Sequence, residues 1–263
     1  MRNGKLVAAF AMLLVASFAT MNAMSSDTLL AALQQEAVLA LVALVAVRFV
    51  VPDVLKRCTK CVQQQNTVRF ASIALLLTGL VGGAIALMTW YFANSGNGAG
   101  FASAALPSAA DLMRNLLLLL GICLLTGVYE EAFMRVLGIE AFEGAMDAKR
   151  AILASAALFA LLHVGAPDVS AGQLVLLQTA LKFAQALLFG VILGVLYTQT
   201  RRLWPCAFIH AGFDVLYLAP NVLLTGTMPA TYASGAVGDT VLLAVTVLML
   251  AGVVLKMRKE ISR

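Results

Sequence analysis

Three apolar stretches of this chain contain side chains that can take up or donate a proton. Carboxylates and imidazoles together can activate water, because each can accept a proton from it. A charged group at the centre of a bilayer costs about 2.5–3.5 kcal/mol, so such residues mark functional sites or buried pairs. The candidates are Glu130, Glu131 and Arg135 in the first stretch, Phe159 and His163 in the second, and His210 and Asp214 in the third.

The first group lies on one predicted helix. Glu130 and Glu131 are adjacent, so their side chains point about 100° apart and cannot share one role. Glu131 and Arg135 are four residues apart and can form an ion pair on one face. Glu130 would then face a cavity alone. The alternative is a solvated helix end, with all three charges in water.

The chain has two histidines, His163 and His210, and both lie in apolar stretches. Phe159 and His163 are one helical turn apart. His210 and Asp214 have the same spacing, so this carboxylate can orient or charge the imidazole. Each group could instead be structural, with His163 as a packing residue and the second pair as a polar patch at the interface. With Glu130, they occupy three different helices, as an active site inside a bundle requires.

Composition decides which elements can carry these residues. Of 263 residues, 62% are hydrophobic and 12% are charged, whereas a soluble domain is nearer half apolar and a quarter charged. Disorder is excluded as well, because disordered chains are poor in apolar residues and rich in charge. The net charge of +5 is spread over short basic clusters between apolar runs. This pattern indicates membrane topology, and no nucleic-acid partner is expected.

We therefore predict an all-α, polytopic membrane protein with about eight transmembrane helices. Crossing a bilayer takes roughly 20 mostly apolar residues. The fourth apolar run is longer than this and the fifth is shorter. The predicted segments are 6–24, 29–51, 70–92, 112–142, 151–164, 174–198, 203–224 and 240–255.

Basic residues predict the orientation of these helices. Lys and Arg accumulate on the cytoplasmic side, and 16 of the 18 fall there when the N-terminus is placed inside. The exceptions are Arg114 and Lys182. Both termini are therefore predicted to be cytoplasmic. The first run follows Arg2 and Lys5 as in a signal peptide, but no clean small-x-small cleavage site precedes Ser25, and we expect an uncleaved helix.

The three groups resemble the motifs of the CPBP family of intramembrane peptidases (CAAX protease and bacteriocin-processing, also called Abi). Its members carry Glu-Glu-x-x-x-Arg, Phe-x-x-x-His and His-x-x-x-Asn or Asp on separate helices in that order. The resemblance implies a CAAX-protease-like catalytic core in residues 112–224. N-terminal transmembrane helices 1–3 would occupy residues 1–111, and the last transmembrane helix with a basic cytoplasmic tail would occupy residues 225–263.

The resemblance also implies a role for each residue of the first two motifs. Glu130 and His163 would activate water. Glu131 and Arg135 would support the site, with Arg135 anchoring a carboxylate or the substrate. Phe159 would be a further supporting residue.

His210 and residue 214 would stabilise the oxyanion. Many members have Asn at the last position, whereas an ionised Asp214 cannot donate a hydrogen bond. Asp214 could instead orient His210 as a cation or serve in a metal site. We favour no cofactor, because the chain has no His-Glu-x-x-His motif. The ligands of a zinc ion, if one is used, would be Glu130, His163, His210 and Asp214.

The resemblance predicts an intramembrane endopeptidase that cleaves a membrane-associated peptide or protein. We expect a multi-pass protein of a bacterial cell membrane, in contact with the lipid bilayer. One alternative is a non-catalytic bacteriocin-immunity or membrane binding protein of the same fold. Another is a secondary transporter, in which intramembrane carboxylates relay protons, although the sequence shows no persuasive internal duplication.

Five further polar or sulfur-containing residues have no role assigned by the resemblance. Cys58 and Cys61 could form a zinc or redox pair or be acylated, but an incidental pair is favoured. Cys123 and Cys206 lie in apolar runs and are expected to pack as small hydrophobes. Lys182 could contact a substrate carboxylate or pair with an interior acid.

The predicted orientation can be tested by cysteine labelling of intact cells. Cys58 and Cys61 belong to the basic loop that we place on the cytoplasmic side, so a membrane-impermeant maleimide should leave both unmodified until the cells are permeabilised. Strong labelling of either cysteine from outside would overturn this topology.

Overall fold

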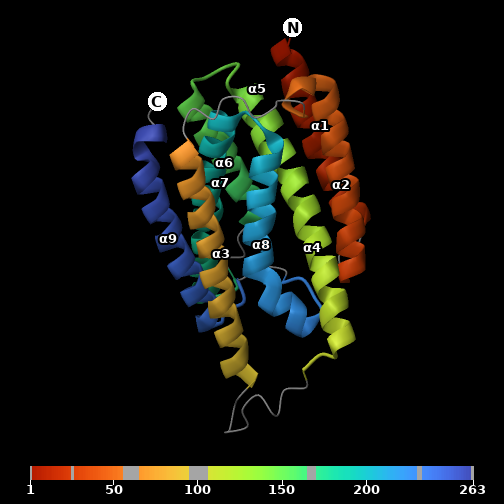
Figure 1. Cartoon of the computed structure of the whole chain (residues 1–263), viewed down its shortest axis with the longest axis vertical. Coiled ribbons are helices and arrows are strands. Elements are labelled where there is room, and N and C mark those ends of the chain that lie inside the picture. The colour runs from red at the N-terminus through yellow and green to blue at the C-terminus, as the bar shows by residue number, and fades with distance from the viewer. Residues whose placement is uncertain are drawn as a thin grey trace.

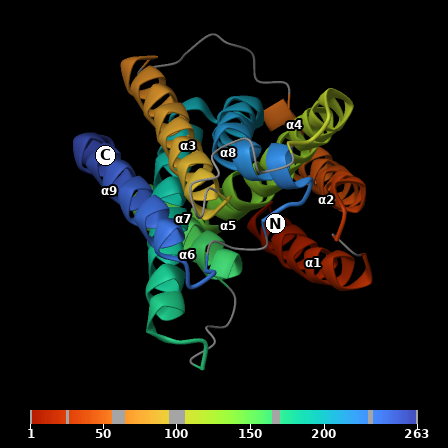
Figure 2. The ribbon, with the colours of Figure 1, turned by 90° about the horizontal axis from the view of Figure 1, so that it is seen from below.

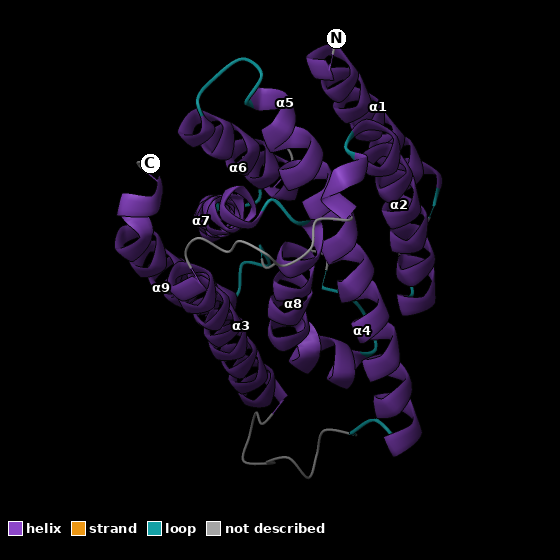
Figure 3. Cartoon of the chain, turned by 45° about the horizontal axis from the view of Figure 1, so that its top comes forward, coloured by secondary structure: helices purple, strands orange, loops and turns teal. Residues whose placement is uncertain are grey.

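The computed structural model describes residues 2–24, 27–55, 65–94, 106–164, 170–229 and 233–261. These residues form helices and connecting loops, without a strand (Figure 3). The all-α prediction is therefore confirmed. The longer helices are α1 (Arg2–Ala23), α2 (Leu29–Val50), α3 (Gln65–Asn94), α4 (Ala109–Glu131), α6 (Ala148–Val164), α7 (Gln173–Thr200), α8 (Leu203–Thr225) and α9 (Val237–Ile261). The shorter ones are η1 (Pro52–Leu55), η2 (Ala132–Ile139) and α5 (Glu140–Phe142).

Seven helical spans in the described part of the chain are long and apolar enough to cross a membrane. The fourth is the continuous run of α4, η2 and α5, which has 34 residues. The fifth predicted segment, 151–164, is not among these spans. It corresponds to α6, whose 17 residues extend about 25 Å at 1.5 Å per residue. This is shorter than the roughly 30 Å of a hydrocarbon core. Helix α6 is thus too short to cross the hydrocarbon core by itself, and it packs against α7 and η2.

Helix α8 lies inside the bundle, between α3 and α4 (Figure 2). Helix α4 also packs against α2, and α7 packs against α6 and α9. Helix α1 lies at the edge, against α2 and η2. The start of α1 and the end of α9 lie at the same end of the bundle (Figure 1). This agrees with the prediction that both termini share one side, and the structure leaves the identity of that side a prediction.

The C-terminal part of the fourth span contains a π-helix, where the sequence analysis predicted an ordinary α-helix. Residues Ala132–Ile139 form η2, directly after Glu131. Its hydrogen bonds run from i to i+5, a rare geometry that occurs often at functional sites. Ser155 on α6 donates to the carbonyl oxygen of Met134 in this segment at 2.7 Å. The wide turn is thereby fixed to the neighbouring helix.

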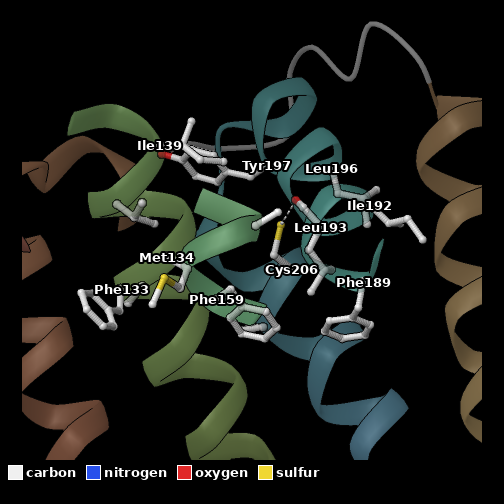
Figure 4. Packing of buried hydrophobic residues seen from close by; sticks show 14 of the residues in the cluster. Phe133, Met134, Ile139, Phe159, Phe189, Ile192, Leu193, Leu196, Tyr197 and Cys206 are labelled. Atoms are coloured by element: carbon white, nitrogen blue, oxygen red, sulfur yellow. Dashed lines mark hydrogen bonds between the residues drawn. The ribbon is translucent and has the colours of Figure 1, made fainter. Parts of the chain in front are cut away.

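Apolar packing holds η2, α6, α7 and α8 together (Figure 4). Cys206 is fully buried, and its thiol contacts the carbonyl oxygen of Leu193 at 4.0 Å. Cys123 is buried as well. The prediction that both cysteines pack as small hydrophobes is confirmed. The labelled residues of this core are Phe133, Met134, Ile139, Phe159, Phe189, Ile192, Leu193, Leu196, Tyr197 and Cys206.

An ionic cluster joins α5 to the turn between α7 and α8. Arg201 ends α7 in the left-handed conformation, with φ at 50°. Its Nη1 and Nη2 donate to the two carboxylate oxygens of Glu143, at 2.7 Å each, and Nη1 also lies 3.3 Å from Glu140 Oε1. The hydrogen bonding to Glu143 raises the pKa of Arg201 above its ordinary value. Arg201 therefore stays a cation and fixes this end of the bundle.

Glycines on α3 allow this helix to touch the backbone of α8. A Cβ atom on Gly79 would lie 2.8 Å from the carbonyl oxygen of Phe213, and one on Gly83 would overlap the carbonyl oxygen of Leu216. Small residues permit such close approach between membrane helices. Helix α8, which carries His210 and Asp214, is held in register by this contact.

Replacing Gly83 with Ala should therefore destabilise the bundle. The added methyl group meets backbone rather than a flexible side chain, and overpacking of this kind costs about 1–3 kcal/mol. The control is Gly252→Ala on α9, where nothing lies within 4 Å of the new Cβ. The melting temperature in detergent should fall for Gly83→Ala and stay unchanged for Gly252→Ala. Equal melting curves for the two variants would contradict the close approach.

Candidate active site

The three motif helices place their polar side chains around a common centre. Glu130 and Glu131 come from the end of α4, Arg135 from η2, His163 from α6, and His210 with Asp214 from α8. The ion-pair contacts link α4, η2 and α8, and His163 reaches the same cavity from α6. The sequence predicted these residues as one site, and the structure brings them together.

Glu131 is the most deeply buried charge of the site. Its Oε2 lies 3.2 Å from Arg135 Nε, with side-chain exposures of 0% and 1%. Its Oε1 lies 2.9 Å from His210 Nδ1, which donates to it. One carboxylate therefore holds two basic groups, one from η2 and one from α8. The i,i+4 pair expected from the sequence is present, although residue 135 lies on a π-turn.

His210 stands between three carboxylates. Its Nε2 lies 3.4 Å from Glu130 Oε2 and 3.4 Å from Asp214 Oδ2. Both ring nitrogens thus face groups that accept hydrogen bonds, an arrangement suited to an imidazole protonated on both nitrogens. Glu130 lines a cavity, as expected, but it does not face that cavity alone, because the imidazole of His210 lies beside it. Glu130 and Asp214 keep 21% and 19% side-chain exposure, while His210 keeps 3%.

The second histidine has a different environment. His163 Nδ1 lies 2.9 Å from the carbonyl oxygen of Phe159. A carbonyl oxygen only accepts, so Nδ1 carries the hydrogen and Nε2 keeps a lone pair. The ring also packs on Phe159, with centroids 4.2 Å apart. His163 is thereby held in the tautomer that can accept a proton from water.

Phe159 separates the two imidazoles and contacts the buried arginine. It is 2% exposed, and its ring centroid lies 6.1 Å from that of His210 and 4.8 Å from Arg135 Cζ. Phe189 on α7 packs against the other side of His210, with centroids 4.8 Å apart at 75°. The aromatic rings exclude water from the Glu131 side of the site. The sequence analysis did not identify Phe189, since one more aromatic residue in an apolar run carries no signal.

Two cavities meet at Glu130 and His163. The polar cavity, of about 210 Å³, is also lined by Thr126, Lys182, His210 and Asp214. The apolar cavity, of about 260 Å³, lies between α1 and the ends of α4 and α6. Glu130 and His163 are the two residues that line both. The walls of the apolar cavity include Leu14, Phe18, Met21, Phe133, Met134 and Leu162.

Glu36 is a site residue that the sequence analysis missed. It lies on α2, forms a side-chain hydrogen bond with Thr126 and interacts electrostatically with Asp214 and His210. Its Oε2 is buried without a hydrogen-bond partner among the described residues. The signal was available, because Glu36 is an acid inside the apolar run 29–51 and therefore costly in a membrane.

Lys182 also reaches the polar cavity, from α7. Its Nζ donates to Gln185 Oε1 at 3.1 Å and lies 5.9 Å from the ring centroid of Tyr217. The sequence analysis left two roles open for this lysine, namely a contact with a substrate carboxylate and an ion pair with an interior acid. The structure places it opposite the carboxylates of α4 and α8.

A zinc ion would need three or four ligating atoms that converge on one point. Within the described residues, no group of three or more His, Cys, Asp or Glu side chains is arranged to hold a metal. Both nitrogens of His210 and Nδ1 of His163 already face oxygen atoms of the protein. His210 Nε2 faces Glu130 and Asp214, which are themselves members of the four-ligand set considered above. The preference for a site without a cofactor stays a prediction. Cys58 and Cys61 lie outside the described residues.

Residues 112–216 match the family model of the Rce1-like proteins, described as type II CAAX prenyl endopeptidase. This segment is similar to the Rce1-like family. The match includes all three motifs and confirms the resemblance inferred from them. The Rce1-like match associates this helical core with membrane peptidases. No curated protein matches the chain.

Arg135→Ala should lower stability, because it leaves Glu131 as a buried charge with half of its partners. Removing one member of a buried pair typically costs about 3–5 kcal/mol. Thermal unfolding in detergent measures the loss. The control is Arg150→Ala, which removes an exposed ion pair with Asp147. The side chains of Arg150 and Asp147 are 76% and 59% exposed, so this variant should change the melting temperature little. An unchanged melting temperature for Arg135→Ala would mean that Glu131 does not depend on this arginine.

Proposed function

We propose that this protein is an intramembrane endopeptidase that hydrolyses a peptide bond in a membrane-associated peptide or protein. The observation that carries the proposal is the position of Glu130 and His163, the pair that lines both the polar and the apolar cavity. A peptide crossing between the cavities would pass the two groups able to activate water. The Rce1-like match supports a peptidase rather than a transporter.

The proposed reaction begins with a water molecule between Glu130 and His163. The Glu130 carboxylate takes a proton as the water oxygen adds to the carbonyl carbon, while His163 Nε2 accepts a hydrogen bond and orients the water. The tetrahedral intermediate then collapses, the C–N bond breaks, and Glu130 returns the proton to the leaving amine. Atoms and charge balance without a cofactor.

The apolar cavity suggests the kind of substrate. Side chains of α1, including Leu14 and Phe18, face Glu130 across it. Ser17 on the same helix accepts a hydrogen bond from Tyr129 at 2.7 Å, which holds α1 beside the site. A bulky apolar side chain or a lipid group beside the scissile bond would fill this space. The substrate would therefore enter from the bilayer.

Glu130→Gln should abolish cleavage while preserving the fold, because an amide cannot take the proton from water. His163→Ala should do the same, and the double variant should be no worse than either single one, as for groups acting as a unit. The assay is mass spectrometry of purified protein with membrane-associated peptides in H₂¹⁸O, where hydrolysis labels the new carboxylate. Asp147→Asn, an exposed carboxylate change, is the matched control and should keep wild-type rates.

Wild-type rates in Glu130→Gln would remove this function. Peptide binding without cleavage by the wild type would favour the non-catalytic binding protein. Loss of activity on chelation, with zinc bound in stoichiometric amount and restoring the rate, would replace the water-activation chemistry by a metal-dependent one.

A further inference from the structure

Lys182 is a cation placed where the proposed reaction develops negative charge. It lines the polar cavity on α7, facing Glu130 on α4 and Asp214 on α8. It interacts electrostatically with both of these acids. A lysine in the middle of a membrane-spanning helix is costly, so its position calls for a physical reason.

A buried hydrogen-bond network fixes the lysine. Gln185 Nε2 donates to Tyr217 Oη on α8 at 3.0 Å and to Thr246 Oγ1 on α9 at 2.6 Å. With its amide nitrogen so engaged, the oxygen of Gln185 faces Lys182 Nζ, which donates to it at 3.1 Å. Gln185, Tyr217 and Thr246 are each 3% exposed or less. Three helices thus orient one ammonium group.

Hydrolysis of a peptide bond needs donors for the carbonyl oxygen as it becomes an oxyanion. An ionised Asp214 can only accept hydrogen bonds. Both nitrogens of His210 face carboxylates. Arg135 is 1% exposed, packs on Phe159, and is not among the residues lining the polar cavity.

The neutral hydroxyls of the polar cavity have partners of their own. Thr126 hydrogen-bonds with Glu36. Tyr217 Oη accepts from Gln185 and keeps its own hydrogen, but it is neutral and brings no positive charge to an oxyanion. Lys182 has three N–H donors, and the structure shows one of them used by Gln185. It is the cation best placed to meet a substrate oxygen in this cavity.

We propose that Lys182 is a catalytic residue whose ammonium donates a hydrogen bond to the scissile carbonyl oxygen in the transition state. This inference rests on the proposed peptidase function. It supplies the donor that an acid at position 214 cannot provide. Asp214 interacts electrostatically with the lysine and lies 3.4 Å from His210 Nε2.

The test uses the full-length protein in detergent and a peptide that the wild type cleaves and Glu130→Gln does not. Lys182→Met keeps the length and apolar body of the side chain and removes the donor. We expect kcat to fall roughly 10²–10³-fold, the loss typical of one oxyanion donor, with KM unchanged. Lys182→Arg, which keeps a charged donor, should retain more activity than Lys182→Met.

A rescue variant separates this role from a structural one. An asparagine side chain can donate where aspartate cannot, so adding Asp214→Asn to Lys182→Met should raise kcat above that of Lys182→Met alone. Melting curves of the variants report any loss of folding independently of rate. If Lys182→Met fails to fold, Lys182→Leu, which also removes the donor, takes its place with the same expected fall in kcat. Wild-type kcat in a folded Lys182→Leu variant would overturn the proposal.

Two other outcomes would also overturn it. Wild-type kcat in Lys182→Met would show that no donor was lost. A rise in KM with unchanged kcat would show that Lys182 binds a substrate group equally in the ground and transition states. Neither outcome touches the peptidase proposal, which stands or falls with Glu130→Gln.

Discussion

An ionised carboxylate inside an apolar bundle is stable only when basic groups surround it, and Glu131 imposes this requirement here. Burial of a lone charge is so unfavourable that each partner must be held in place. Arg135 meets one oxygen of Glu131 from the π-helix η2, and His210 meets the other from α8. The close packing of α3 on α8 and the hydrogen bond from Ser155 to η2 keep these partners in position.

The same imidazole that neutralises Glu131 also faces the carboxylates of the cavity. One nitrogen of His210 points to the buried side and the other lies 3.4 Å from both Glu130 and Asp214. The imidazole of His210 therefore both stabilises the buried Glu131 and contacts the carboxylates of the polar cavity. The aromatic contacts of Phe159 and Phe189 against this ring keep it in one orientation. A change on the buried side would move the carboxylates on the cavity side.

The site also lies where a polar cavity and an apolar cavity meet, at Glu130 and His163. Lys182, fixed through Gln185 to α8 and α9, gives the polar cavity its cation. Helix α1, fixed to α4 through Ser17 and Tyr129, forms one wall of the apolar cavity. Helices outside the matched segment 112–216 thus complete a site whose main acids and imidazoles lie within it.

The class of the protein, its helical segments and the residues at the centre of the site could all be predicted from the sequence alone. These follow from local rules: apolar runs long enough for a bilayer, basic clusters between them, and polar groups one turn apart where polarity is costly. The sequence also predicted the Glu131–Arg135 pair, because i,i+4 contacts depend on one element alone. Only the tertiary structure decided that His210 would serve Glu130, Glu131 and Asp214 together, that Glu36 and Lys182 would approach the same centre, and that η2 would be a π-helix. These features depend on how helices far apart in the chain pack side by side, and no spacing within one helix contains that information.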